Sequence, residues 1–373
     1  GIIVLFVAVL GQGSAGKALM RAEIPGPNKE GSQERMQHAA WSFAAIYLAL
    51  NLVLAIILKV EGLSLRGGMS WFDAICHAFG TMATGGFSTY NASLGYFDSA
   101  LIEYTVLVFM IIAGMNFSLI YLAMIGRVGL MLKDVEWRTY LGIIVGGSLA
   151  LIAISVFMSH DFDLEDRSEM GRELYDAARY VPFTFVSILT TTGYGTHDFD
   201  KWNQFARAVL FLLMFVGGCA GSTGGGLKVI RHVLFIKILR LEIEHSFHPT
   251  VVRHLRLGGV AIPDQEVRKQ ILLYFGLVTF IFMLSWLLLV GFEPDATWTD
   301  HGHSLGNKLI DCASAVAATL NNIGPGLGTV GATQNYAVFS PFAKLLFTFL
   351  MMLGRLELFA ILVLAMPSFW RVR

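Results

Sequence analysis

The stretch YDAARYVPFTFVSILTTTGYG, residues 175–195, decides the fold. Its apolar part, Tyr175 to Thr191, is shorter than the roughly 20 residues that a helix needs to cross a membrane, and it ends in Gly193-Tyr194-Gly195. Non-helical backbone at membrane depth is tolerated only where protein buries it or where it lines a water-filled cavity. The stretch therefore predicts a short helix that enters a membrane and turns back beside a pore.

The composition of the whole chain supports a membrane setting. The 373 residues are 55% hydrophobic and only 14% charged, whereas soluble domains carry about 25% charged residues. Cys76, Cys219 and Cys312 are too dispersed for a disulfide framework or a zinc site. The 27 basic residues balance 27 acidic ones, which argues against a nucleic-acid binder.

The same order of segments occurs three times, as a long span, a half-span with a glycine exit and a second long span. An aspartate near the start of each half-span (Asp73, Asp176 and Asp311) is read as a helix cap, because a carboxylate is stabilised there by about 0.3–1 kcal/mol. The segments are Trp41–Val60, Trp71–Met82 and Ala100–Ile125, then Tyr140–Met158, Tyr175–Thr191 and Phe205–Ile236, then Ile271–Val290, Leu309–Leu320 and Phe342–Met366.

The basic residues predict the orientation, because cytoplasmic connections carry an excess of Lys and Arg. The stretches Lys17–Arg35, Arg127–Arg138 and Lys228–Lys269 hold 4, 3 and 8 of them, and Arg371 and Arg373 follow the last span. We expect these segments in the cytoplasm and the acidic loops outside. The acidic stretch Asp161–Glu173 either attracts cations or only keeps its loop soluble, and the sequence leaves both open.

The half-spans predict a pathway for cations. A short helix that enters from outside points its partially negative C-terminal end at the membrane centre, and the segment after it can aim carbonyl oxygens at an ion. Glycine is favoured there because such backbone angles are costly for residues with a Cβ. The candidate glycines are Gly85, Gly193 and Gly324.

A glycine-rich run interrupts the last span of the second unit. Residues 217–226 contain six glycines, and at about 1 kcal/mol per Gly relative to Ala the helix should unwind beneath the filter. Close helix packing is the alternative, but it favours small residues at every fourth position. The run consists of Gly217, Gly218, Cys219, Ala220, Gly221, Ser222, Thr223, Gly224, Gly225 and Gly226.

Arg355 is predicted in the middle of the last span, where a charge costs at least about 2.5 kcal/mol unless it faces a partner or water. Glu357 follows two residues later and points to another helix face, so it is a poor partner. Arg355 is therefore expected to face the pore or a structural partner elsewhere.

The sequence resembles a known family at several motifs. Thr191-Thr192-Gly193-Tyr194-Gly195 is similar to the TVGYG-type filter of potassium channels, and the whole chain resembles the Trk/Ktr/HKT superfamily of potassium transporters, closest to the bacterial TrkH type. Further matching stretches are Arg-Ala-Glu-Ile-Pro-Gly-Pro at 21–27, Gly-Gly-Phe-Ser-Thr at 85–89 and Gly-Tyr-Phe-Asp-Ser at 95–99.

The resemblance implies an all-α polytopic membrane protein of helix–pore-loop–helix repeats around one central pore, four in the family. Residues 1–40 then hold the end of a first repeat, at Ile2–Leu10, and a cytoplasmic loop, and complete repeats occupy residues 41–139, 140–269 and 270–373. The first filter segment is absent from the sequence given. The expected filter residues, which bind potassium as the only metal, are Ala83, Thr84, Gly85, Thr191, Thr192, Gly193, Tyr194, Asn322, Ile323 and Gly324.

The resemblance further implies potassium uptake across the bacterial inner membrane, with the glycine run as a gate that Arg355 helps to close. It implies a homodimer, a cytosolic nucleotide-binding regulatory subunit and no covalent cofactor. The segment Lys228–Lys269 is either the docking surface for that subunit or a positive-inside anchor.

Four other functions compete with this interpretation. Sodium or weakly selective cation transport by the same fold is the main one. An alternating-access transporter would have inverted repeats, and these units share one orientation. An enzyme would need clustered ionisable groups, which the sequence lacks. Gly326–Gly331 matches GxGxxG without the strand that a dinucleotide site needs, and His301 and His303 are read as ordinary loop residues.

Overall fold

The computed structural model describes residues 33–65, 68–156, 170–248, 255–258, 260–262, 265–300, 302, 304–356 and 358–366. Several predicted features lie outside these residues, namely the remnant at Ile2–Leu10, the acidic residues 161–169, His301, His303, Glu357, Arg371 and Arg373.

The helices are α3 (Gln33–Gly62), α4 (Trp71–Met82), α5 (Ala100–Ala113), α6 (Phe117–Met124), α7 (Val128–Lys133), α8 (Val135–Ile154), α9 (Met170–Leu189), α10 (Gln204–Leu213), α11 (Val229–Phe247), α12 (Gln265–Phe292), α13 (Ala296–Thr299), α14 (Lys308–Leu320), α15 (Pro341–Arg355) and α16 (Leu358–Ala365).

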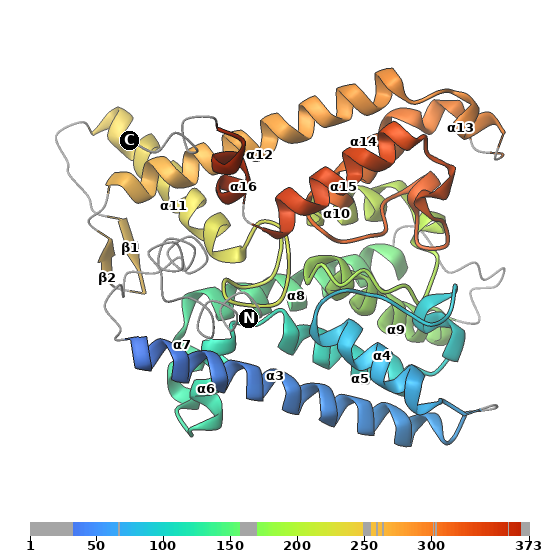
Figure 1. The fold of residues 1–373 in the computed structure, drawn as a ribbon, viewed down its shortest axis with the longest axis horizontal. Helices are drawn as coiled ribbons and strands as arrows, with labels where there is room; N and C mark the ends of the chain where they lie inside the picture. The colour runs from blue at the N-terminus through green and yellow to red at the C-terminus, as the bar shows by residue number, and fades with distance from the viewer. Residues whose placement is uncertain are drawn as a thin grey trace.

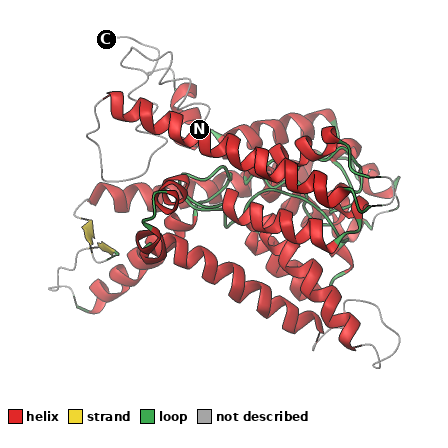
Figure 2. Ribbon diagram, turned by 90° about the horizontal axis from the view of Figure 1, so that it is seen from below, coloured by secondary structure: helices red, strands yellow, loops and turns green. Residues whose placement is uncertain are grey.

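Helices account for almost all regular structure in the described residues, as Figure 2 shows. The exception is a small antiparallel hairpin of β1 (Leu255–Leu257) and β2 (Val260–Ile262), which lies beside α11 at one end of the molecule (Figure 1). The predicted helical fold class is therefore confirmed, with this hairpin as an addition that the sequence did not indicate.

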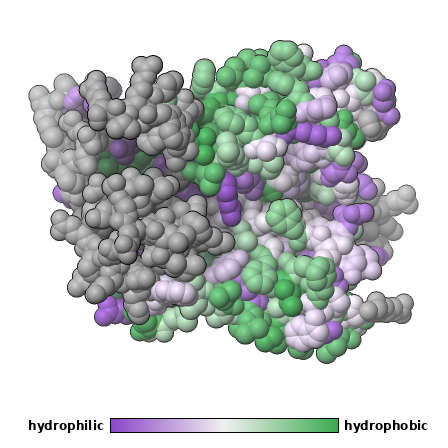
Figure 3. All heavy atoms as spheres, in the orientation of Figure 1, coloured by the Kyte–Doolittle hydropathy of each residue, from purple (hydrophilic) through white to green (hydrophobic). Residues whose placement is uncertain are grey.

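The first long span of each predicted repeat is a continuous helix. Trp41–Gly62 within α3, Val135–Ile154 in α8 and Val267–Phe292 within α12 are long and apolar enough to cross a membrane. Many large apolar side chains on α3 and α12 are exposed, and in Figure 3 apolar residues gather along the two edges where these helices lie. This apolar belt is the surface that lipid would cover.

All three predicted second long spans are broken, and the sequence predicted a break only in the span that contains the glycine run. In the first complete repeat, Ala100–Ile125 divides into α5 and α6, which meet at an angle of 102°. Asn116 caps α6 by accepting a hydrogen bond from the Ser118 N–H, which starts a new helix instead of continuing the old one. In the next repeat α10 and α11 are separated by residues 214–228, and in the last α15 ends at Arg355.

The short helices α4, α9 and α14 are the predicted half-spans, although α9 begins earlier than expected, at Met170. Asp73 forms a capping box with Ser70 and so confirms one predicted cap. Asp176 is wrong as a cap, because the early start of α9 places it well inside the helix. Asp311 instead accepts hydrogen bonds from Trp298 and Thr329.

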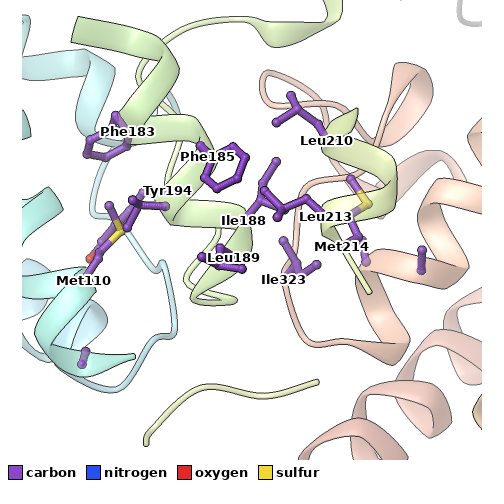
Figure 4. Packing of buried hydrophobic residues seen from close by; sticks show 14 of the residues in the cluster. Met110, Phe183, Phe185, Ile188, Leu189, Tyr194, Leu210, Leu213, Met214 and Ile323 are labelled. Carbon is purple, nitrogen blue, oxygen red and sulfur yellow. The ribbon is translucent and has the colours of Figure 1, made fainter. Parts of the chain in front are cut away.

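The core packs around these short helices. Ile188 of α9 points toward Leu213 of α10, and Met110 of α5 lies beside Tyr194 (Figure 4). From Asp311 to Leu320 every residue of α14 is buried. Because the three short helices are surrounded by protein, the loops that follow them are held inside the molecule, where Figure 2 shows them between the helices.

Candidate functional site: the filter loops and the glycine loop

The short helices α4, α9 and α14 end in the same way. Thr84, Thr191 and Asn322 have φ angles of 49°, 57° and 57°, in the left-handed region. Two residues later a glycine again has positive φ, at 62° for Gly86, 82° for Gly193 and 104° for Gly324. The backbone hydrogen bonds at the C-terminal ends of the three helices also match. They run from Gly85 N–H to Gly80 O (2.8 Å), from Thr192 N–H to Ser187 O (2.9 Å) and from Ile323 N–H to Ala318 O (2.8 Å).

This repeated geometry corrects the predicted alignment of the first filter segment. Gly86, not Gly85, is equivalent to Gly193 and Gly324, so the pair equivalent to Thr191 and Thr192 is Thr84 and Gly85. Ala83, expected to provide a pore-facing carbonyl, corresponds instead to the helix C-cap. The error arose because two adjacent glycines offered two registers. With Gly86 as the reference, Asp73 and Asp311 both precede their glycine by 13 residues, a signal present in the sequence.

The three candidate filter segments, which contain Gly86, Gly193 and Gly324, lie against one another in chain order. A Cβ on Gly86 would collide with the carbonyl oxygen of Thr192, and a Cβ on Gly193 would collide with that of Ile323. The first two segments therefore each present their glycine to the backbone of the next, whereas a Cβ on Gly324 would meet nothing within 4 Å. Such close backbone contact requires glycine, in addition to the requirement from positive φ.

Side chains hold the segment of the middle repeat in place. The Thr190 and Thr192 hydroxyls are 2.8 Å apart, and Ser187 Oγ donates to the Tyr194 carbonyl at 2.8 Å. The Tyr194 hydroxyl donates to the His77 carbonyl of α4 at 3.1 Å, and the two rings stack. Tyr194, predicted as a filter residue, thus braces the loop against the neighbouring repeat.

The glycine loop, defined as residues 217–226, is unwound as predicted and lies directly against the ends of the filter segments. The Thr84 hydroxyl donates to the Thr223 carbonyl at 2.9 Å, and the Gly225 N–H donates to the Thr191 hydroxyl at 2.7 Å. A Cβ on Gly225 would contact Asn322 at 2.9 Å. The loop therefore touches the left-handed residue of all three described segments.

Two cationic side chains reach the same region. Lys228, the residue before α11, donates to the Gly224 carbonyl of the glycine loop. Arg355 lies at the C-terminal end of α15, not in the middle of a continuous span, and donates to the Ala83 carbonyl at 3.3 Å. Arg355 is exposed. The predicted partner of Arg355 is therefore a backbone oxygen at the end of α4.

Charged contacts join neighbouring repeats at the side where the short helices begin. Arg179 of α9 binds Glu103 of α5 and Asp98 at 2.8 Å each. Asp200 accepts the Gly328 N–H at 2.9 Å and pairs with Arg207 at 3.6 Å. Burial raises the pKa of the Asp200 carboxyl, against the opposing effects of Gly328 and Arg207. Sequence reasoning missed these contacts, since no local motif marks them.

The fold and the contacts of these loops define the class of protein. The short helices are buried among helices long and apolar enough to cross a membrane, and the segments that follow them contact the glycine loop. This arrangement is typical of polytopic membrane proteins that pass cations. No group of His, Cys, Asp and Glu suited to hold a metal ion occurs among the described residues.

Comparison with known proteins gives the family. Residues 1–372 match the TrkH family, described as cation transport protein, and the chain belongs to this family. It is 37% identical to the Trk system potassium uptake protein TrkH of Halomonas elongata and 36% identical to that of Escherichia coli K12, covering all of this chain and 71% of each relative. The crystal structure of the potassium transporter TrkH from Vibrio parahaemolyticus superimposes with a TM-score of 0.78 at 35% identity, covering all of this chain and 70% of that one.

The relatives are named as transporters, in agreement with the prediction that the chain is not an enzyme. The chain is an integral membrane protein, as its family and its apolar helices require.

Proposed function

We propose that this protein takes up potassium across the bacterial inner membrane through a filter of backbone carbonyls. The observation that carries the proposal is the threefold ending of α4, α9 and α14, where the left-handed residue and the glycine recur at the same offset. Such a backbone turns successive carbonyls toward a common axis, where they can replace the hydration shell of an ion. The relatives are named potassium uptake proteins, which supports the choice of ion.

The carbonyls assigned to the filter are those of Thr84 and Gly85, Thr191 and Thr192, and Asn322 and Ile323. The ion-coordinating segments carry no charged side chain, so attraction comes from carbonyl dipoles and from the C-terminal ends of the short helices. Potassium ions in this filter are the only bound metal that we propose, and no covalent cofactor is needed. Sodium or weakly selective transport by the same fold is the alternative.

The glycine loop acts as the gate in this proposal. Its contacts with Thr84, Thr191 and Asn322 support that role, because a loop seated against all three segments obstructs the inner end of the filter. Arg355 adds a fixed positive charge beside the Ala83 carbonyl, which opposes cation passage. We also propose a homodimer and a cytosolic nucleotide-binding subunit that moves the loop, by analogy with the family.

The test of selectivity is rubidium uptake into proteoliposomes that contain the protein, with excess potassium or sodium as competitor. Competition by potassium alone is expected. Equal competition by sodium would replace the potassium assignment with weakly selective transport, and competition by sodium alone would establish the sodium alternative.

The test of the gate is deletion of Ser222–Gly225. The deletion removes the residues that contact Thr84 and Thr191, so the rubidium uptake rate should rise. An unchanged rate in a protein that still elutes as a single species from size-exclusion chromatography would contradict the gate.

A further inference from the structure

The buried side chain of Glu136 binds two backbone N–H groups, one on each side of the last four glycines of the glycine loop. Its Oε1 atom accepts the Ala220 N–H at 2.7 Å and the Ile230 N–H at 3.1 Å. Ala220 belongs to the glycine loop, whereas Ile230 is in the first turn of α11. Glu136 itself is in the first turn of α8 and only 7% exposed. One oxygen atom therefore connects three separate segments.

The carboxylate fills a role that α11 does not fill for itself. The N-cap residue of α11 is Lys228, whose side chain makes no capping bond. The first N–H groups of a helix lack partners within it, and a negative charge at that end is stabilised. Glu136 supplies the acceptor and the charge from another helix, so it holds the start of α11 and the loop together.

We infer that Glu136 is the positioning residue that holds the glycine loop in its closed place and couples it to α11. This rests on the proposed gate. Because one oxygen binds both Ala220 and Ile230, it keeps the two ends of the segment between them close together and restricts how far Ser222 to Gly225 can move from the filter unless α8 or α11 moves as well. A shift of α11 changes the distance from Ile230 to Glu136, and the shared oxygen transmits that change to Ala220.

The neighbouring cysteine provides a probe that does not depend on ion flux. Cys219 directly precedes Ala220 and is fully buried. Cys312 in α14 is also fully buried but lies far from Ala220 in the sequence, so it serves as an internal control. If Glu136 holds the loop, its loss exposes Cys219 and leaves Cys312 protected. Alkylation by N-ethylmaleimide of the full chain in proteoliposomes, followed at each cysteine by mass spectrometry, separates a local from a general loosening.

The variants are Glu136→Ala, which removes the acceptor, Glu136→Asp, which withdraws it by one methylene, and Glu136→Gln, which keeps an oxygen at the same distance. Asp134→Asn is the matched control, since Asp134 lies two residues away and caps α8 through the Trp137 N–H at 2.8 Å without touching the loop. Should Glu136→Ala fail to fold, Glu136→Asp gives the answer.

We expect Glu136→Ala and Glu136→Asp to raise the Cys219 alkylation rate by about tenfold, the change that corresponds to about 1.4 kcal/mol in an opening equilibrium. Asp134→Asn should leave it close to the original rate, and Cys312 should not respond in any variant. Glu136→Gln keeps an acceptor but loses the charge, so its rate should lie between those of the unmodified protein and Glu136→Ala. An unchanged Cys219 rate in both Glu136→Ala and Glu136→Asp, or equal rises at Cys219 and Cys312, would overturn the inference.

The same variants show whether Glu136 acts through the loop. Rubidium uptake should rise in Glu136→Ala, and the rise should vanish when Ser222–Gly225 is also deleted, because residues coupled through one element do not add. If Glu136→Ala raises rubidium uptake by the same factor when Ser222–Gly225 is deleted, Glu136 does not act through the loop. If the deletion alone leaves uptake unchanged, the gate fails, while the Cys219 result still decides whether Glu136 holds the loop.

Discussion

Single residues fix the backbone of the proposed filter, and Gly86 is tightly constrained. Its φ is 62°, and a Cβ would collide with the Thr192 carbonyl. Gly86→Ala therefore combines about 1–2 kcal/mol of left-handed strain with displacement of a filter oxygen. We expect rubidium uptake to fall by at least about tenfold, which corresponds to about 1.4 kcal/mol.

Two other alanine variants serve as controls for Gly86→Ala. Gly85 does not have positive φ, and the nearest atoms to its Cβ would be those of the Phe87 ring at 3.0 Å, so Gly85→Ala should be milder. Gly142→Ala lies in α8 with open space around it and should leave uptake intact while stabilising the helix by roughly 0.5–1 kcal/mol. A stronger effect of Gly85→Ala than of Gly86→Ala would restore the register first read from the sequence.

Arg355→Gln gives the second prediction at this scale. A hydrogen bond from a charged donor contributes about 1.5–3 kcal/mol, and Arg355 makes one with the Ala83 carbonyl. Its removal should favour passage and raise the initial rate of rubidium uptake by about tenfold. Lys344→Gln is the control, because Lys344 lies exposed on the same helix and donates to the Ala337 carbonyl instead of to a carbonyl at the end of α4. Equal rates in Arg355→Gln and the unmodified protein would assign Arg355 a structural role alone.

At the scale of elements, the sequence predicted the features that depend on segment length and glycine content. It missed a bend that depends on tertiary contacts. The half-spans at 71–82 and 309–320 and the unwound glycine loop followed from length and glycine content. The 102° bend between α5 and α6 did not, because Gly114 alone is a weak signal. Its backbone carbonyl accepts the Cys219 N–H at 2.8 Å, a contact with a loop about 100 residues away in the chain.

The contact between α9 and α5 gives a prediction about stability. Arg179 forms two bonds with Glu103, which is 2% exposed. Arg179→Met would leave this carboxylate buried without its partner, at a cost of about 3–5 kcal/mol. Arg268→Met is the control, since Arg268 and Glu242 pair at 3.8 Å near the surface and such pairs contribute about 0–1 kcal/mol. Denaturation by dodecyl sulfate in mixed micelles should rank the two variants in this order, and similar midpoints would contradict it.

For the whole molecule, the repeats predicted from the sequence are joined in chain order at two depths. At the filter, Gly86 meets Thr192 and Gly193 meets Ile323. Nearer the start of the short helices, Arg179 joins the first pair of repeats and Asp200 joins the second. Periodicity in one sequence identifies repeats but not their neighbours, which is why this arrangement required the structure.

The orientation of the protein in the membrane determines the side from which ions first reach the proposed filter. The basic residues of α11 and the hairpin lie at the end of the molecule opposite α13 and the start of α14 (Figure 1). Because the cytoplasmic side carries the excess of Lys and Arg, Arg256 should lie inside and Ser304 outside. Both residues are exposed, so each can be replaced by cysteine in a background without Cys76, Cys219 and Cys312.

A membrane-impermeant maleimide applied to intact bacterial cells should label Ser304→Cys, and it should label Arg256→Cys only after the cells are opened. Labelling in the reverse order would place the hairpin outside. The C-terminal ends of α4, α9 and α14 would then receive ions first from the cytoplasm, and the glycine loop would lie on the outer side of the filter. A gate moved by a cytosolic subunit would be ruled out, whereas the carbonyl filter itself would stand, because its geometry does not depend on which side is inside.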